Sequence, residues 1–556
     1  MIRDLWYKNA IIYSLSIDSF ADANGDGVGD FDGAIGKLDY LQGLGVTAVW
    51  LAPFHPSPRR DHGYDVTDYY GVDPQFGTLG DFVEFTHACG QRGIRVIMDL
   101  VLNHTSDQHP WFQAAQAKDS PYRDFYVWSD RKPKDAHKGV VFPGVQETTW
   151  SHSEAAKAWY FHRFHKFQPD LNMANPAVRR ELLKVVGFWI QAGVSGFRLD
   201  AVPFLIAREG ADAGATEPAY AVLQELREFS QWRSGEVVFL AEANVQPQEA
   251  KHYFGERGDR LHMMFNFPVN QTLFYALAAA DARPLRAEIR KSARLPHAAQ
   301  WTNFLRNHDE LDLGRLEEGQ RQTVFDAFGP EPNMQLYDRG IRRRLAPMLK
   351  GDLRRIKLAN SLMLTLPGSA VLRYGDEIGM GDDLRLPERD CARTPMQWSG
   401  GAQAGFTACA EPARPPIADG AYGYHTVNVA HQRPDPDSLL NWTERAIRLR
   451  KELPEIGWGQ VSVLKAPNQI LALRYDWRGV ASVFIHNLAE ARIECSIDVT
   501  AGDEPAPAMV CLQTDDVSEP DEAGRHRVVL EPYSFRWYRI GGLDTMPGGN
   551  DAVAAP

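Results

Sequence analysis

The chain has 556 residues, of which 44% are hydrophobic and 24% charged, and its formal net charge is −12. This composition is ordinary for a folded globular protein, and the length allows two or more domains or one large barrel with additions. The dispersed negative charge argues against nucleic acid or an anionic membrane as the main partner, and no apolar run approaches the roughly 18 residues of a membrane span.

Eight short apolar segments predict β-strands along the first two thirds of the chain. They span residues 10–17, 46–53, 94–104, 194–202, 236–244, 262–268, 300–310 and 368–377. A segment with helical periodicity lies ahead of each strand after the first, which makes the strands parallel. Eight parallel strands joined by helices predict an α/β protein built on a closed (β/α)8 barrel, or TIM barrel.

The segment DANGDGVGD, residues 22–30, follows the first predicted strand and resembles the start of an EF-hand calcium loop. Its oxygen-bearing side chains are those of Asp22, Asn24, Asp26 and Asp30. Loop position twelve, where an EF-hand needs a bidentate Glu, is Gly33, and a strand precedes the loop instead of a helix. A helix-loop-helix switch is therefore excluded. The residues alone leave open a loop that holds an ion and an Asp/Gly turn that holds none.

Two long stretches interrupt the alternation of strands and helices. Residues 105–174, after the third strand, are rich in Trp, Tyr, Pro and His and predict an inserted loop-rich subdomain over the carboxyl ends of the strands. Residues 311–345 form a second insertion, which ends in RGIRRRLAPML. We expect its basic run to be a solvated face.

The periodicity changes after residue 461. Short alternating strands with turn signals predict a C-terminal antiparallel β domain, a β-sandwich, over residues 462–541. Residues 542–556 predict a disordered tail. The barrel itself is then expected to comprise residues 1–104 and 175–461.

Polar residues gather at the carboxyl ends of five predicted strands, the face at which such barrels carry active sites. They are Asp99, Asn103, His104, Arg198, Asp200, Glu242, His308, Asp309, Asp376 and Glu377. Glycoside hydrolysis with retention needs one carboxylate that attacks the anomeric carbon and a second that protonates the departing oxygen. Three of the carboxylates, Asp200, Glu242 and Asp309, are the candidates for this chemistry.

The surroundings of each carboxylate suggest its role. Asp200 lies two residues after Arg198 in a strand, so the two side chains share a face and the cation can keep the carboxylate ionised, as a nucleophile requires. Glu242 lies between alanines after an apolar strand, where a carboxyl tends to stay protonated, as a general acid requires. Asp309 follows His308 and is placed to bind sugar hydroxyls and favour an oxocarbenium-like transition state.

These motifs resemble glycoside hydrolase family 13, the α-amylase family, over about residues 5–540. In chain order they are DLVLNH (99–104), QPDLN (168–172), GFRLDA (196–201), LAEAN (240–244) and FLRNHDE (304–310). The resemblance implies that Asp200 is the nucleophile, Glu242 the acid/base and Asp309 the transition-state stabiliser. It implies that the sugar-binding residues are Asp61, Tyr64, His104, Gln168, Arg198, His308 and Arg393.

The resemblance also implies the shape of the pocket and the fate of the Asp-rich loop. Tyr64 would stack on the glucose ring, while Asp61 and Arg393 of RTPMQW would grip its non-reducing end, as in members that act on the terminal glucose of small α-glucosides. The loop would bind a structural calcium ion (Ca2+). Its ligands would be Asp22, Asn24, Asp26, Asp30 and the carbonyl of Val28.

The sequence resembles one branch of the family, the trehalose synthases or maltose–trehalose isomerases, in SPYRDFYVWSD, GIRRRLAPML, YGDEIGMGD and RTPMQWS. It departs from that branch on the acceptor side. Val245 and Gln246 replace an expected Gln and Trp, and Ala207 replaces a Glu that helps to bind a second calcium beside Asn103 and Asp170. These departures keep open isomerisation, hydrolysis as an α-glucosidase, and transfer of glucose to another acceptor.

The expected substrate is a small α-glucoside such as maltose, trehalose or sucrose. Transporter subunits of this fold that have lost catalysis carry a membrane span and substituted carboxylates, unlike this chain, and no distinct phosphate-binding feature supports a phosphorylase. The N-terminal residues MIRDLWYKNA lack the apolar core of a signal peptide, and the five cysteines form no C-x-x-C pair. We therefore expect a cytoplasmic protein with free thiols, no disulfide framework and no zinc site.

Overall fold

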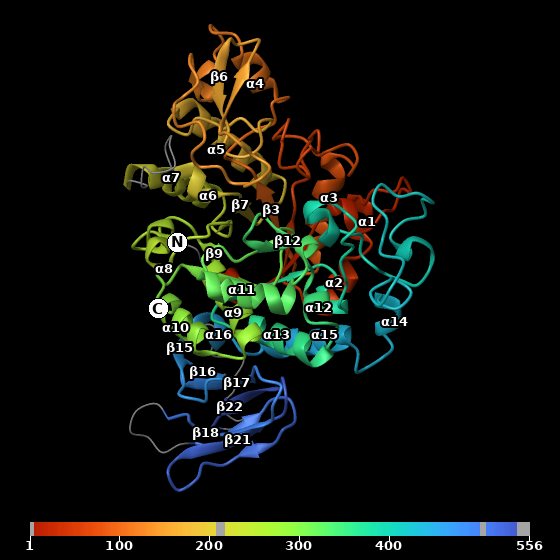
Figure 1. Cartoon of the computed structure of the whole chain (residues 1–556), viewed down its shortest axis with the longest axis vertical. Helices are drawn as coiled ribbons and strands as arrows, with labels where there is room; N and C mark the ends of the chain where they lie inside the picture. Colours follow the sequence, from red (N-terminus) through yellow and green to blue (C-terminus); the bar gives the residue numbers. More distant parts are fainter. Residues whose placement is uncertain (1–4, 207–216, 501–506, 542–556) are drawn as a thin grey trace.

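The computed structural model describes residues 5–206, 217–500 and 507–541. The predicted tail, residues 542–556, and Ala207 lie outside these ranges. Among the helices within them, none is long and apolar enough to cross a membrane, and the five cysteines are free thiols. The inserted subdomain, the barrel and the C-terminal β domain follow one another along the longest axis of the molecule (Figure 1).

The centre of the molecule is a closed barrel of eight parallel strands, which confirms the predicted fold class. The strands are β1 (Ile11–Leu15), β2 (Ala48–Leu51), β3 (Arg95–Leu100), β7 (Gly196–Leu199), β8 (Val238–Ala241), β9 (Met263–Phe265), β10 (Gln300–Phe304) and β14 (Ser369–Arg373). Each lies inside one of the eight predicted segments, and β1 closes the barrel by pairing with β14. The strand sequences are apolar runs because helices cover the outer face of the barrel and side chains fill its interior.

Helices surround the barrel and join its strands (Figure 1). They are α1 (Phe31–Ile35), α2 (Leu38–Leu44), α3 (Leu79–Gln91), α5 (Pro176–Gln191), α6 (Val202–Ile206), α7 (Glu217–Arg233), α8 (Pro247–Phe254), α9 (Phe267–Ala279), α10 (Arg283–Ser292), α13 (Leu353–Thr365) and α15 (Leu439–Lys451). Local chemistry sets their ends. A capping box of Thr78 and Asp81 starts α3, and α2 ends at Gly45, whose φ of 92° favours glycine.

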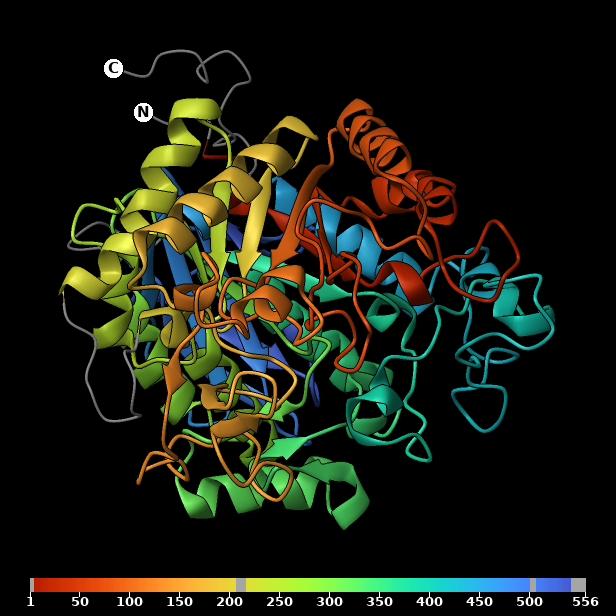
Figure 2. The same ribbon diagram turned by 90° about the horizontal axis from the view of Figure 1, so that it is seen from above.

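The connection after β3 forms the inserted subdomain, which lies over the barrel when the molecule is viewed from above (Figure 2). Its elements are α4 (Pro110–Ala115), β4 (Trp128–Ser129), β5 (Trp150–Ser153) and β6 (Ala158–Phe161). The strands form a small sheet in the order β4-β6-β5. Isolated bridges pair His104 with Asp170 and Tyr126 with Leu171, so the two ends of the insertion lie side by side at the barrel.

The second insertion follows β10 and packs its basic run inward. It comprises β11 (Leu311–Asp312), α11 (Glu318–Phe328), β12 (Gln335–Leu336), β13 (Gly340–Ile341) and α12 (Leu345–Met348). The prediction of a solvated basic face is wrong, because Arg342 and Arg344 are buried. Arg342 donates to four backbone carbonyls, while Arg343 pairs with Asp382 and Arg344 with Asp376. Loops leave carbonyl oxygens without partners, and a guanidinium with five donors satisfies several at once.

A third long connection, between β14 and α15, was not singled out from the sequence. Its short helices are η5 (Asp376–Ile378), η6 (Glu388–Ala392), η7 (Ala402–Gly405) and α14 (Val429–Gln432). One part lies beside the Asp-rich loop, residues 22–30 (Figure 2), where the amide of Asp22 donates to the carbonyl of Phe406 at 3.0 Å. Another part, η6, reaches back to the carboxyl ends of the strands, where Arg389 pairs with Asp309.

The C-terminal domain packs on the opposite end of the barrel from the inserted subdomain (Figure 1). After α16 (Glu455–Trp458) come β15 (Gln460–Val463), β16 (Ile470–Trp477), β17 (Val480–Asn487), β18 (Ile493–Asp498), β19 (Met509–Cys511), β20 (Val517–Ser518), β21 (Arg525–Leu530) and β22 (Phe535–Ile540). A six-stranded sheet and the β18–β21 pair share one apolar core, so this part is the antiparallel β domain that the sequence predicts. A buried ion pair, 2.8 Å long, joins Arg539 of β22 to Glu455 of α16.

Candidate active site

Three barrel strands deliver the three candidate carboxylates to one cavity. Asp200 follows β7, Glu242 follows β8 and Asp309 lies in the loop after β10, and all three line a cavity of about 430 Å³. That volume suits a small ligand. The same cavity is lined by three of the predicted sugar-binding residues, Asp61, Tyr64 and His104.

Arg198 links the carboxyl groups of the site through hydrogen bonds. Its buried guanidinium donates to Asp200 at 2.7 Å, as the strand spacing predicts, and to Asp99 on the neighbouring strand β3 at 2.6 Å. It also donates to Glu242, which the sequence did not indicate. One cation therefore contacts three carboxyl groups, which come from three neighbouring strands of the barrel.

The pKa values of Asp200 and Glu242 are separated by their surroundings. Burial raises the pKa of Asp200 to about 6; Arg198 opposes the rise, while Asp99 and Asp309 add to it. Burial raises the pKa of Glu242 to about 8, again against Arg198 and with Asp200 and Asp309 adding to the rise. Near neutral pH this arrangement leaves Asp200 ionised and Glu242 protonated, the division that a nucleophile and a general acid require.

Asp309 is held in the ionised form. Burial disfavours its charge, but Arg389, His308 and Arg393 outweigh burial and keep the pKa of this carboxyl well below its usual range. Arg389 lies 3.0 Å and Arg393 3.1 Å from its Oδ1, and His308 lies 3.1 Å from its Oδ2. Of the three candidate carboxylates, Asp309 therefore stays negative throughout the pH range in which the other two titrate.

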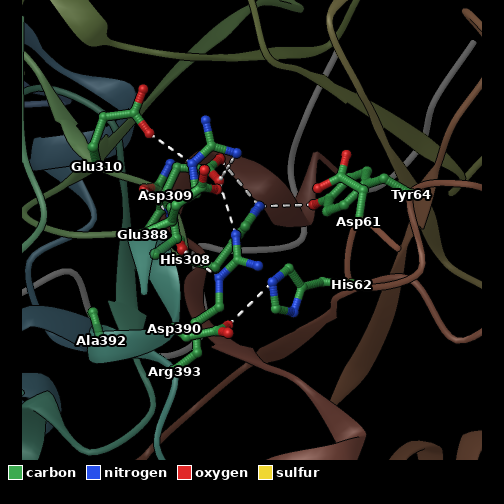
Figure 3. A network of polar contacts seen from close by, with 12 residues as sticks. Asp61, His62, Tyr64, His308, Asp309, Glu310, Glu388, Asp390, Ala392 and Arg393 are labelled. Atoms are coloured by element: carbon green, nitrogen blue, oxygen red, sulfur yellow. Dashed lines mark hydrogen bonds and ion pairs between the residues drawn. The ribbon is translucent and has the colours of Figure 1, made fainter. Parts of the chain in front are cut away.

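Tyr64 lines the cavity and is held there by His308, which does not line it. The Tyr64 hydroxyl lies 2.7 Å from Nε2 of His308, and the two rings are stacked with their planes 20° apart (Figure 3). The hydroxyl also donates to Asp99 at 3.0 Å. His104 lies behind, with Nε2 3.2 Å from the Tyr64 carbonyl. These contacts fix the tyrosine ring in a single orientation at the cavity surface.

Gln168 contacts Asp61 and is not exposed to the cavity. Its buried amide donates to Oδ2 of Asp61 at 2.8 Å and its oxygen accepts from the amide of His165. Burial opposes the charge on Asp61, but Arg389 and the bond from Gln168 keep the pKa of this carboxyl below its ordinary value. We therefore infer that Gln168 acts indirectly, by stabilising the ionised form of Asp61.

Arg393 does not line the large cavity, whereas Arg389 does. Arg393 donates to the carbonyl of His308 at 2.8 Å and lines a second, smaller cavity next to the first. Arg389 lines the large cavity and pairs with Asp309 and Glu310 (Figure 3 shows these carboxylates). Arg389 was not among the predicted site residues. Its only sequence signal is its position four residues ahead of Arg393 in RDCARTPMQW.

A chain of polar contacts, here called the polar arc, runs along the cavity wall beyond Glu242. Its members are Asn244, Arg315, Asp312, Arg339 and Val141, all of which line the cavity. Arg315 donates to the side-chain oxygen of Asn244 at 2.7 Å, and Asn244 donates to Asp312 at 2.7 Å. Arg339 lies 3.6 Å from Asp312 and donates to the Val141 carbonyl at 3.2 Å. The arc thus joins the loops after β8 and β10 to the inserted subdomain.

The residues that depart from the resembled branch occupy different places. Val245 is apolar and lines the cavity beside Asn244. Gln246 forms a capping box with Glu249 at the start of α8. Asn103 and Asp170 are both buried at the junction with the inserted subdomain, and burial raises the pKa of Asp170 to about 7.

The Asp-rich loop is closed by hydrogen bonds to its own backbone. Asp22 accepts from the amides of Gly25 and Gly27, and Asp30 accepts from those of Ala23, Asn24 and Gly33. The remaining predicted ligands, Asn24, Asp26 and Val28, follow in the same turn. In the described part of the chain, no group of three or more His, Cys, Asp or Glu is arranged for a metal ion. The donor set itself, oxygen atoms only, is the kind that calcium prefers.

Comparison with known proteins adds family evidence to this geometry. The family profile described as "Alpha amylase, catalytic domain" matches residues 12–323 and 341–459. A trehalose synthase of Thermus thermophilus is 42% identical over 96% of this chain, which spans 56% of that protein. The trehalose synthase/amylase TreS of Mycolicibacterium smegmatis is 40% identical over 98% of this chain and 94% of its own. The crystal structure of isomaltulose synthase from Klebsiella sp. LX3 matches with a TM-score of 0.77 at 26% identity, covering 97% of this chain and 100% of its own.

Proposed function

This chain belongs to the α-amylase family of glycoside hydrolases, and from its site we propose a retaining enzyme that transfers the terminal glucose of small α-glucosides. One observation carries the proposal. Asp200 and Glu242 share Arg198 at the wall of one cavity, while their pKa values differ in the sense that a nucleophile and an acid need.

The reaction follows from these protonation states. A carboxylate oxygen of Asp200 attacks the anomeric carbon, and the proton of Glu242 moves to the glycosidic oxygen as the bond to the leaving sugar breaks. Glu242, now a carboxylate, then takes the proton of the acceptor hydroxyl as that oxygen displaces Asp200 from the anomeric carbon. Two inversions give net retention. The fixed charge of Asp309 favours the positive character that develops on the sugar ring in both steps.

Maltose–trehalose isomerisation is the first candidate for the second step. The leaving glucose must stay, turn and present its anomeric hydroxyl before water enters. The polar arc supports this assignment, since it lies beyond Glu242, where the leaving sugar is released, and offers charged and amide groups to hold its hydroxyls. A trehalose synthase and a trehalose synthase/amylase are 42% and 40% identical to this chain.

Hydrolysis or transfer to another acceptor is the second candidate. It is favoured by Val245, an apolar residue of the cavity wall that offers no hydrogen bond to a released sugar. Water or a different hydroxyl compound would then attack the glucosyl group on Asp200. Sucrose and trehalose are further substrates to be compared with maltose, because each also presents a terminal α-glucosyl group.

We further propose that the Asp-rich loop holds a structural calcium ion through Asp22, Asn24, Asp26, Asp30 and the Val28 carbonyl. Its oxygen donors support this proposal, and the contacts of Asp22 with Phe406 and Thr407 support a role in tethering the connection after β14. The five free thiols are in keeping with the reducing cytoplasm, where we place the enzyme.

The deciding experiment is a time course on maltose, followed by chromatography and by nuclear magnetic resonance of the anomeric protons. Trehalose that appears at early times, with glucose as a minor product, is the result we expect. Glucose alone at every time point would exclude isomerisation as the main activity and leave hydrolysis. A rapid fall in the viscosity of soluble starch would exclude a pocket that accepts only terminal glucose.

A further inference from the structure

The loop that carries Asp61 and Tyr64 and the segment that carries Arg389 and Arg393 come from opposite ends of the barrel sequence. They meet behind the cavity, at His62 and Asp390 (Figure 3), where Nε2 of His62 lies 3.1 Å from Oδ1 of Asp390. His62 directly follows Asp61 in the sequence, Asp390 directly follows Arg389, and both Asp61 and Arg389 line the large cavity. The contact therefore joins the two sides of the site directly.

We propose that His62 and Asp390 are positioning residues, which hold their sequence neighbours Asp61 and Arg389 at the separation that fits one terminal glucose. This inference rests on the proposed function, because it takes Asp61 and Arg389, which both line the large cavity, as residues that bind the sugar. Neither His62 nor Asp390 lines the large cavity. They act on the substrate only through their neighbours.

The location of His62 supports a positioning role. His62 lines the smaller cavity, of about 30 Å³, together with Arg393 and Arg414. That volume has room for one or two water molecules but not for a sugar. Tyr64 lines both cavities, whereas His62 lines only the smaller one.

The backbone of this loop needs an external support. His62 has a φ of 50° and Arg59 a φ of 57°, left-handed conformations that side chains rarely adopt. Gly63, with a φ of 97°, lies so close to Pro53 that a Cβ would come within 3.0 Å of its carbonyl oxygen. Such conformations persist where surrounding contacts over-determine them. The contact between His62 and Asp390 is one of these supporting contacts, and His62 is itself a residue in the left-handed conformation.

Asp390 is in turn tied to the backbone of Arg393. Arg414 lies 3.4 Å from Oδ1 of Asp390 and donates to the carbonyl of Arg393 at 2.8 Å. Burial and the charges of Arg393 and Arg414 lower the pKa of His62 to about 3, against the opposing effect of Asp61 and Asp18. His62 is therefore a neutral hydrogen-bond donor at every working pH, and the contact does not depend on its charge.

The test is a double-mutant cycle read by kcat/KM on an aryl α-glucoside. We expect His62→Ala and Asp390→Ala each to lower kcat/KM about tenfold, because small misplacements of binding groups carry large rate costs. The double variant should be no worse than either single one. His62→Gln, which keeps a neutral donor, should recover most of the loss. His87→Ala, an exposed histidine on α3, is the matched control and should behave as the parent protein.

Asp61→Ala separates this inference from the proposed function. It should lower kcat/KM by about a hundredfold or more, and His62→Ala should cause no further loss in that background. Parent-like kinetics of both His62→Ala and Asp390→Ala beside a large Asp61→Ala effect would overturn the positioning role alone. A tenfold loss that persists in the Asp61→Ala background would do the same. Parent-like kinetics of Asp61→Ala would overturn the pocket itself. Melting temperatures identify a variant that fails to fold, and His62→Gln and Asp390→Ala then carry the test.

Discussion

Arg389 lies 3.0 Å from Asp309 and approaches it from a segment that is 80 residues further along the chain. The same guanidinium pairs with Glu310 at 2.8 Å, so it spans the two acids that end the FLRNHDE motif. Its charge is the largest of the effects that hold Asp309 ionised against burial. The connection after β14 is thus part of the active site, although the carboxylates come from the barrel.

The first prediction concerns the catalytic pair. Asp200→Asn and Glu242→Gln should each lower turnover of an aryl α-glucoside by about 10⁴-fold or more, since one loses the nucleophile and the other the acid. Steady-state kinetics and circular dichroism on the same samples measure the two effects. Turnover within tenfold of the parent protein in either variant would refute the assignment of that residue.

The second prediction is the pH profile. kcat/KM should rise as the pH passes about 6, because Asp200 must lose its proton, and fall above about 8, because Glu242 must keep its own. A substrate with a strongly activated aryl leaving group needs little protonation and should show a weaker alkaline limb. An unchanged alkaline limb in Glu242→Gln would mean that another group donates the proton.

The third prediction tests Arg389. Arg389→Ala should lower kcat on an aryl α-glucoside by about 10–100-fold, because the anionic Asp309 loses the partner that orients it in the cavity. Arg354→Ala is the matched control, since Arg354 is an exposed arginine whose ion pair, with Asp352, is on the surface. Equal kinetics of the two variants would show that Arg393 and His308 suffice to hold Asp309.

The fourth prediction concerns the polar arc. Arg315→Ala removes the contact with Asn244 and opens the wall beyond Glu242, so water should reach the glucosyl group more often. The share of free glucose among the products of maltose should rise about threefold or more while aryl glucoside turnover changes little. Arg283→Ala, at an exposed ion pair with Asp281, is the control. A product ratio identical to that of the parent protein would exclude the arc from the retention of glucose.

The fifth prediction concerns calcium. An ion that binds only the folded loop stabilises the protein by about 2.7 kcal/mol when free calcium is about 100 times the dissociation constant. Chelation should therefore lower the melting temperature and leave activity below that temperature largely intact. Asp26→Ala should abolish the effect of the chelator, whereas Asp39→Ala, at an exposed acid on α2, should retain it. Elemental analysis that finds no calcium in protein purified without chelator would contradict the site.

The barrel and its three carboxylates could be predicted because they depend on local sequence. Each strand is an apolar run with a helical segment ahead of it, and all eight lie where the runs predict. A parallel barrel places the carboxyl ends of its strands on one face, so Asp200, Glu242 and Asp309 had to meet there. The closeness of Arg198 to Asp200 followed from the two-residue period of a strand.

Only the tertiary structure decided which distant groups face these residues. Three such relationships join different strands or segments from opposite ends of the barrel sequence. They are the contact of Arg198 with Glu242, the position of Arg389 in the cavity and the His62–Asp390 contact. The sequences of irregular connections have no periodic pattern from which contacts can be predicted. A guanidinium donates hydrogen bonds to whichever carbonyl or carboxylate the fold brings next to it. For the same physical reason the basic run at Arg342–Arg344, polar by composition, is held inside the protein by oxygen atoms that the sequence does not place beside it.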